Sequence, residues 1–371
     1  MKILFTTDQT HLHGGIEKVL AEKANYFADV LGYDVTILTT EQKNNIPCYA
    51  LSAKISQIDI AINYHREKSY FHPSNIRKIP SHLKHWKKIL NTINPDIIIV
   101  CNYAFDFYWN PFLFTRIPKL KEYHASRYFE SKARETSGFA SKLKFAVNDF
   151  IESKYTRLIL LNPDEKQYYR SKNTKVIPNP ITIPAAKANL DNKKAIAAGR
   201  IAPVKGFEKA ILCWKKVIER SPDWELHIYG QGETAYINTL IDLIAENNLQ
   251  NHVHILPAVD GLQTKMLDYS LYLMSSQTEC YPMVLLEALS IGLPVISFNC
   301  PTGPRNIITD DKDGFLAQNQ DITALAEKTL LLTADVSLRK AMGNAAITNS
   351  PRFSTPTVMK GWKDLFDTLI Q

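Results

Sequence analysis

Short uninterrupted apolar runs alternate with helix-length amphipathic segments along this chain, and the alternation restarts after a proline-rich break. In the first half the apolar runs predict strands over residues 2–7, 34–39, 96–101, 157–161 and 175–177. Strands that are apolar throughout, with helices between them, indicate a parallel sheet covered by helices on both faces. The first half is therefore expected to form an α/β layer structure.

The break lies at residues 178–184, where three prolines fall within seven residues, and it is the best linker candidate. After it, further strands are predicted over 195–199, 225–229, 252–256, 271–274 and 294–298. The pattern predicts two doubly wound α/β domains, with a ligand where the carboxyl ends of the strands meet. We expect domains over 1–184 and 185–350, and a C-terminal helix within 351–371 that could cross back to the first domain.

Charge and cysteine usage narrow the possible functions. The net charge of +7 is uneven, because residues 1–185 carry +9 and residues 186–371 carry −2, so the first half is expected to face something anionic. Five scattered cysteines without a Cys/His cluster suggest neither disulfides nor zinc. No signal peptide or spanning segment is apparent, and a cytoplasmic protein is expected. No nucleic-acid module is visible.

Gly14-Gly15 stands between the first strand and the first helix. Paired glycines let an anion approach the backbone amides at a helix N-terminus, but they also occur in tight turns that need a positive φ. Both interpretations stay open from the residues alone. The chain has neither Gly-x-Gly-x-x-Gly nor a P-loop sequence, so a dinucleotide dehydrogenase and a P-loop enzyme lack their fingerprints.

Arg200 and Lys205 are placed where the first strand of the second half gives way to a helix. Arg offers a planar fork to phosphate oxygens and Lys a mobile point charge, so the two would suit a diphosphate. The alternative is a pair of solvated surface cations. Glu279 and Glu287 flank the start of another helix at Pro282, and two carboxylates so spaced can accept hydrogen bonds from two polyols. Glu287 lies among apolar residues, where an unpaired carboxylate would be costly.

Taken in order, several motifs resemble those of the retaining glycosyltransferases of family 4. They are Gly14-Gly15-Ile-Glu17, Ile177-Pro-Asn179, Gly199-Arg200 with Lys205-Gly206, Tyr229-Gly-Gln-Gly-Glu233, Glu279-x7-Glu287, Gly292-Leu-Pro294 and Asp313-Gly-Phe-Leu316. The resemblance implies the GT-B architecture, two Rossmann-like domains facing across a cleft. Residues 297–304 resemble the subgroup that builds bacterial surface polysaccharides, such as lipopolysaccharide or capsule, from UDP-sugars.

The resemblance also implies roles for single residues. Arg200 and Lys205 would hold the donor diphosphate and Glu287 the nucleotide ribose. Glu279 would contact the sugar hydroxyls, aided by the amides of Tyr281, Pro282, Met283 and Val284, although Pro282 can offer no amide hydrogen. Gly14 and Gly15 would approach the donor phosphate, and His124 would stand beside the sugar. No metal or cofactor is implied. Two departures, Pro180 and Cys280, replace glycines of the family pattern, and Cys280 could narrow the sugar pocket.

The implied function is metal-independent, retaining transfer of a hexose or N-acetylhexosamine from a UDP-sugar to a glycan or lipid-linked oligosaccharide. The alternatives are a non-hydrolysing epimerase of the same architecture and a non-catalytic nucleotide-sugar-binding protein. Residues 77–90 form a basic amphipathic segment with Trp86 on its apolar side. That segment would suit an anionic membrane surface on the cytoplasmic face of the inner membrane, or would be an ordinary helix packed on the sheet.

Overall fold

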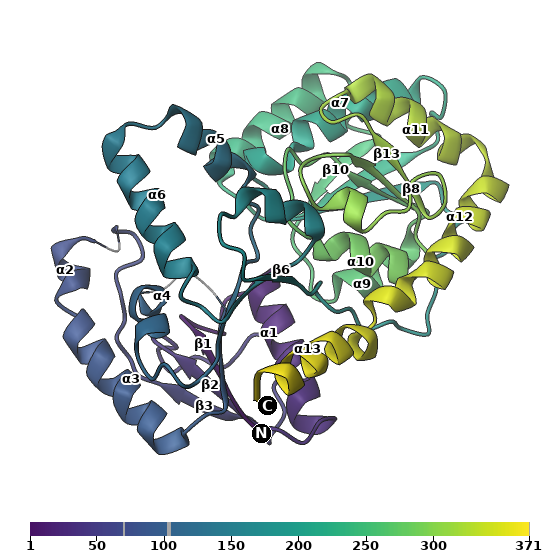
Figure 1. Cartoon of the computed structure of the whole chain (residues 1–371). Coiled ribbons are helices and arrows are strands. Elements are labelled where there is room, and N and C mark those ends of the chain that lie inside the picture. Colours follow the sequence, from purple (N-terminus) through teal and green to yellow (C-terminus); the bar gives the residue numbers. More distant parts are fainter. Residues whose placement is uncertain (70, 102–104, 371) are drawn as a thin grey trace. The chain divides into compact units, whose positions relative to one another are not determined.

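The computed structural model describes residues 1–69, 71–101 and 105–370 and divides them into two compact units (Figure 1). Unit 1 contains Met1–Pro180 and the C-terminal helix α13 (Thr355–Ile370), and unit 2 contains Ile181–Ser354. The border thus lies four residues before the expected position 184, and the last helix is counted with unit 1. None of the described helices combines the length and the apolarity that a membrane span requires.

Unit 1 is built on a seven-stranded parallel sheet with the order β3-β2-β1-β4-β5-β6-β7. Its strands are β1 (Lys2–Thr7), β2 (Asp34–Thr39), β3 (Ser56–Asp59), β4 (Ile97–Val100), β5 (Lys119–Glu122), β6 (Arg157–Leu160) and β7 (Thr174–Val176). Alternate residues of the strands point to opposite faces. Ile3 and Phe5 pack with α1 (Gly15–Asp29) and α13, whereas Leu4 packs in a second core with α3 (Ile79–Ile93).

Unit 2 repeats the design with a six-stranded parallel sheet of order β10-β9-β8-β11-β12-β13. Its strands are β8 (Lys194–Ala198), β9 (Glu225–Tyr229), β10 (Val253–Leu256), β11 (Leu271–Met274), β12 (Val295–Phe298) and β13 (Gly314–Ala317). One face is covered by α7 (Phe207–Ile218), α8 (Thr234–Glu246) and α11 (Ile322–Ala334), whose apolar residues join a single core with the strands. The remaining long helices of the unit are α10 (Met283–Ser290) and α12 (Val336–Asn349).

Three of the strands were not predicted from the sequence, and β5 shows why. Its sequence Lys-Leu-Lys-Glu looks like a surface segment, yet all four residues are buried. The Lys119 ammonium donates to the carbonyls of Phe114 and Ile117, and Lys121 donates to the carbonyl of Glu122. A buried ammonium is tolerated only with such partners, so long-range contacts decide this strand.

Helix α3 corrects the expectation for residues 77–90. Trp86 is fully buried and packs with Leu90 against the sheet, so it cannot serve as an interfacial anchor. Lys84, Lys87 and Lys88 remain exposed on the opposite side of the helix. The segment is therefore a covering helix of unit 1 with a basic outer face, which was the alternative that the sequence left open.

Candidate functional site

The candidate donor site lies where the strand order of unit 2 reverses direction. Starting from β8, the chain adds β9 and β10 on one side and β11, β12 and β13 on the other, which is the order 3-2-1-4-5-6. In open parallel sheets of this kind, ligands bind beyond the carboxyl ends of the two strands at the reversal. Lys205 follows β8 and Glu279 follows β11, so both predicted residues stand at that point.

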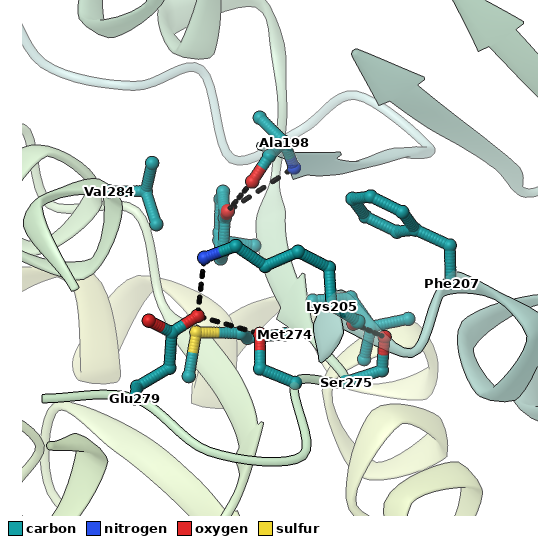
Figure 2. Close-up of a pocket in the computed structure, with 10 residues that line it drawn as sticks. Ala198, Lys205, Phe207, Met274, Ser275, Glu279 and Val284 are labelled. Carbon is teal, nitrogen blue, oxygen red and sulfur yellow. Dashed lines mark hydrogen bonds and ion pairs between the residues drawn. The ribbon is translucent and has the colours of Figure 1, made fainter. Parts of the chain in front are cut away.

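Lys205 and Glu279 form an ion pair in unit 2 (Figure 2). The distance from Lys205 Nζ to Glu279 Oε1 is 2.6 Å, and Ser276 Oγ donates to the same carboxylate oxygen at 2.7 Å. The two side chains are 24% and 12% exposed, respectively, so neither is a freely solvated surface charge. They border a small hollow of about 10 Å³ whose lining also includes Ala198, Met274 and Val284.

A tight turn holds Lys205 in place. A short 3-10 helix, η3 (Pro203–Lys205), is followed by Gly206, which has a φ of 61° and is the N-cap residue of α7. A Cβ on Gly206 would lie 2.4 Å from the carbonyl oxygen of Ser275, so only glycine fits both the conformation and the space. Ser275 Oγ donates to the carbonyl of Lys205 at 3.1 Å and ties this turn to the end of β11.

The loop that carries Glu279 is fixed by its backbone. Glu279 N–H donates to the Pro301 carbonyl, while the N–H groups of Thr302 and Gly303 both donate to the Glu279 carbonyl. Thr278 Oγ1 also donates to the Pro301 carbonyl at 2.6 Å. The loop that carries the Glu279 carboxylate is therefore fixed by hydrogen bonds to residues 301–303, which follow β12.

Tyr272, on β11, also lines the hollow. Its hydroxyl donates to the Ala198 carbonyl at 2.9 Å and accepts from the Ala198 N–H at 3.2 Å, and burial raises the pKa of Tyr272. This hydroxyl and the Ser275-Ser276 pair were missed in the sequence. Small polar residues directly after an apolar strand are the signal that could have pointed to the serines.

Helix α10 brings the other predicted donor-binding residues to the same unit. It begins at Met283 after Pro282, as the sequence predicted, and its first amides have no partner within the helix. Val284 lines the hollow beside Lys205 and Glu279. Glu287 is 5% exposed on the second turn, and Tyr281 and Cys280 are also buried.

Arg200 differs from Lys205 in its environment. It lies just beyond β8 and is exposed, and within the described part of the chain no hydrogen bond or ion pair of its side chain is found. The structure thus gives Lys205 a partner and leaves Arg200 as a solvated cation at the same end of the sheet.

In unit 1, Gly14 and Gly15 stand at the N-terminus of α1. Gly14 is the N-cap residue with an extended φ of −162°, and neither glycine has a positive φ. The tight-turn explanation therefore does not apply. A Cβ on Gly15 would meet no atom within 4 Å, so the space beside its backbone is open.

His124 follows β5 and is almost completely buried. Its Nε2 lies 3.7 Å from Glu122 Oε2, and within residues 1–69, 71–101 and 105–370 this nitrogen has no hydrogen-bond partner. Burial lowers the pKa of His124, against the opposing effect of Glu122. Glu122 is itself paired with Lys23 of α1; burial raises its pKa, but Lys23 and His124 outweigh this and hold it below its ordinary value.

One group of side chains has the composition of a metal site. The ligand atoms of Glu225, His227 and His254 lie within 4.8 Å of one another. Glu225 begins β9, so the group stands at the amino end of the sheet, away from Lys205 and Glu279. Both ring nitrogens of His227 already have protein partners, because Nε2 is 2.9 Å from Glu225 and Nδ1 is 2.8 Å from the Tyr269 hydroxyl.

Comparison with known proteins gives matches over nearly the whole chain. Residues 13–183 match the family described as Glycosyltransferase Family 4, and residues 180–349 match Glycosyl transferases group 1. An uncharacterized glycosyltransferase of Haemophilus influenzae is 26% identical over 95% of this chain and 96% of its own length. A poly(ribitol-phosphate) alpha-N-acetylglucosaminyltransferase of Staphylococcus aureus is 25% identical, over 63% of this chain and 48% of the relative.

Solved structures show the same fold. The structure of Anabaena HepE in complex with UDP-glucose superposes with a TM-score of 0.75 and 18% identity, covering 99% of this chain and 100% of the HepE chain. The two-sheet architecture found here is thus shared over the full length of a solved protein.

Proposed function

Because the chain belongs to the family 4 glycosyltransferases and has their GT-B architecture, we propose that it transfers a hexose or N-acetylhexosamine from a UDP-sugar. The anomeric configuration is retained, and the acceptor is a glycan or lipid-linked oligosaccharide of a bacterial surface polysaccharide. The relative from S. aureus, named for transfer of N-acetylglucosamine, and the UDP-glucose complex of HepE support this choice of donors.

The observation that carries the proposal is the Lys205–Glu279 pair at the strand reversal. Before the donor binds, each side chain neutralises the other at 2.6 Å. A diphosphate entering between the first turns of α7 and α10 offers Lys205 a stronger anionic partner, which leaves the Glu279 carboxylate available to sugar hydroxyls. One preformed pair would thus serve both ends of the donor.

The chemistry asks for stabilisation of the leaving group. Breaking the anomeric C–O bond leaves negative charge on the diphosphate and positive charge on the sugar ring. Two unit charges about 4 Å apart, at an effective dielectric constant of about 20, interact by about 4 kcal/mol. Lys205, aided by the exposed Arg200 and by the amides of Met283 and Val284, would supply several kcal/mol of this kind to the transition state.

The other predicted residues take the remaining roles. Glu287, on the second turn of α10, is proposed to accept hydrogen bonds from the ribose. Gly15 is proposed to bind the donor phosphate, and the open space beside its backbone supports this role. His124 is proposed to stand beside the sugar, with its ring oriented by the Glu122 carboxylate 3.7 Å from Nε2.

A screen of nucleotide sugars by thermal shift, followed by product analysis, tests the function. We expect one UDP-sugar to raise the melting temperature and to yield an α-linked product when the donor is α-linked, as judged by NMR of the anomeric proton. Inversion at the anomeric carbon would contradict the retaining mechanism. Formation of an epimerised UDP-sugar without transfer would instead assign the epimerase activity.

Metal independence is tested separately, by assaying transfer after treatment with EDTA and after adding back Mg²⁺ or Mn²⁺. We expect full activity in EDTA, because Lys205, Arg200 and the amides of α10 carry the positive charge in this mechanism. A strict requirement for either ion would contradict that assignment.

A further inference from the structure

Helix α6 (Phe139–Glu152) of unit 1 exposes an apolar face that nothing in the described chain covers. Phe139, Leu143, Val147 and Phe150 recur at helical spacing and are 84%, 56%, 45% and 55% exposed, respectively. Single exposed apolar residues are common in proteins, but a continuous row of four large ones marks an interaction surface. Only Ile151 and Glu152 of this helix are buried.

The apolar surface continues beyond the helix. Phe71 and Tyr108 join Leu143 and Val147 in lining a groove of about 380 Å³, with Lys144 at its edge. Phe71 is itself 54% exposed. At the other end of the row, the ring of Phe150 stacks on Phe112 with centroids 6.2 Å apart, and Phe112 is 43% exposed. The helix row, the groove and Phe112 together are called the α6 surface below.

The free charges on helix α6 itself are positive, whereas Glu135 of the preceding helix α5 (Tyr128–Thr136) is an exposed carboxylate. Lys142 and Lys144 are exposed on the helix, and Lys154, just after it, lies over the ring of Phe150 at 4.9 Å. The two carboxylates of the helix are neutralised within the protein. Arg134 binds Asp149 with two hydrogen bonds of 2.8 Å, and Arg127 pairs with the buried Glu152.

We propose that the α6 surface docks this protein onto a bilayer containing anionic phospholipid. Apolar side chains flanked by lysines, without a free carboxylate on the helix, suit a surface that is apolar inside and negatively charged outside. Lysine stems can extend past the apolar row and place their ammonium groups at the phosphates. The groove could receive an acyl chain while Lys144 meets the headgroup.

Docking in this way would bring unit 1 to an acceptor that is carried on a membrane lipid. That link rests on the proposed function, whereas binding to the bilayer does not. This membrane contact through α6 replaces the one expected through residues 77–90. The apolar side of α3 is buried in the core of unit 1, whereas that of α6 is exposed.

The experiment is co-sedimentation of the full chain with vesicles of phosphatidylcholine alone and of phosphatidylcholine with phosphatidylglycerol, at low and high salt. We expect binding to the anionic vesicles that weakens in high salt, because exposed charges are screened. The triple variant Phe139→Gln, Leu143→Gln, Val147→Gln and the double variant Lys142→Glu, Lys144→Glu should each bind about 10-fold more weakly or worse.

Matched controls change equivalent residues elsewhere. Ile241→Gln with Leu331→Gln alters two apolar residues of unit 2 that are 49% and 48% exposed, and Lys84→Glu with Lys88→Glu reverses two exposed lysines of α3. Both controls should bind like the unchanged protein. UDP affinity, measured for every variant, establishes that it is folded and that the donor site is intact.

Several outcomes would overturn the proposal. The first is that a protein that binds UDP does not bind vesicles. The second is that the Lys84→Glu, Lys88→Glu control loses as much vesicle binding as the α6 variants. The third is equal binding to neutral and anionic vesicles. Self-association in sedimentation velocity that disappears in the triple variant would assign the α6 surface to a second copy of the chain instead. Failure to bind vesicles would leave the glycosyl transfer proposal untouched, and absence of transfer would leave vesicle binding untouched.

Discussion

At the scale of single residues, Lys205 and Glu279 illustrate how a site can be held ready without its ligand. Each side chain is partly buried, and a partly buried charge without a partner would cost free energy. The Lys205–Glu279 ion pair neutralises both charges, and the Ser276 hydroxyl donates a further hydrogen bond to the carboxylate. Arg200, by contrast, is exposed, and its side chain has no hydrogen-bond or ion-pair partner among the residues that the structure describes. We therefore expect the lysine to be the fixed charge of the site and the arginine to order when a ligand binds.

Substituting Lys205 by Ala should lower kcat by on the order of 100-fold or more, because its charge is needed most when the diphosphate departs. Steady-state kinetics with the best UDP-sugar provides the measurement. Lys215→Ala, an exposed lysine at the far end of α7, is the matched control and should leave kcat unchanged. A Lys205→Ala protein with a raised KM and an unchanged kcat would place the lysine in ground-state binding only.

Glu287→Gln should weaken UDP and the UDP-sugar alike, each by roughly 1–3 kcal/mol, the value of a hydrogen bond to a charged group. Calorimetric titration with UDP measures this, and Glu246→Gln on the exposed side of α8 serves as the control. If a folded Glu287→Gln protein binds UDP as tightly as before, the residue does not contact the ribose.

At the scale of elements, α3 shows that a basic amphipathic sequence can be a structural helix. Trp86 and Leu90 are buried, and the His82 ring is fixed by the Tyr64 hydroxyl, 2.9 Å from Nδ1, and by the edge of Trp109. Helix α6 has a similar composition, yet its apolar row has no counterpart on the sheet. Whether an amphipathic helix is covered depends on what the rest of the chain offers it.

His82 makes the stability of the protein depend on pH. Burial lowers the pKa of His82 to about 4, whereas an unfolded histidine has a pKa of about 6.5. Between these values the unfolded chain binds a proton that the folded one does not, so the free energy of unfolding falls as the pH drops from about 6.5 to 4. The contribution is about 3 kcal/mol, is fully present above pH 6.5, and is lost progressively below it.

Urea unfolding at pH 7 and pH 4.5 checks this expectation. The His82→Gln protein should lose about 2–3 kcal/mol less between the two pH values than the unchanged protein, because glutamine does not titrate. His85→Gln, one turn along α3 and exposed, should behave like the unchanged protein. Identical pH dependence with and without His82 would show that its ring is protonated without cost in the fold.

At the scale of the whole molecule, the two units are separate sheets joined at two places, since the chain leaves unit 1 at Pro180 and returns to it at Thr355. The returning helix α13 buries Met359, Trp362 and Phe366 in the core that also contains Phe27 of α1. The last residues of the chain therefore complete the first unit, and unit 2 is an insertion between the parts of unit 1.

Phe366→Ala should consequently destabilise unit 1 by about 3–5 kcal/mol, the usual cost of removing a buried phenylalanine. The affinity of the folded protein for UDP should stay unchanged, because the proposed contacts of UDP with unit 2 do not involve α13. Urea unfolding and calorimetry give the two values, with Ile370→Ala, an exposed position of the same helix, as the control. A parallel loss of UDP affinity would show that the donor site depends on this helix.

The sequence by itself determined most of the sheet and the candidate donor site. Apolar runs between helix-length segments predicted inner strands and also the edge strands β7 and β10, and residues that follow parallel strands gather at one edge of the sheet. That is why Lys205, Glu279 and the start of α10 at Pro282 could be placed without coordinates. The local sequence was sufficient there, because the residues that form the predicted motif are the same residues that form the turn or helix start in the structure.

Only the tertiary structure decided the rest, because the deciding partners are distant in sequence. The lysines of β5 are buried by carbonyls that the pattern of the strand does not reveal. Trp86 is covered by the sheet while Phe139 and Leu143 are not, although both helices are basic and amphipathic. Periodicity fixes which side of a helix is apolar, but only the packing of the whole chain determines whether that side is buried or left free to bind.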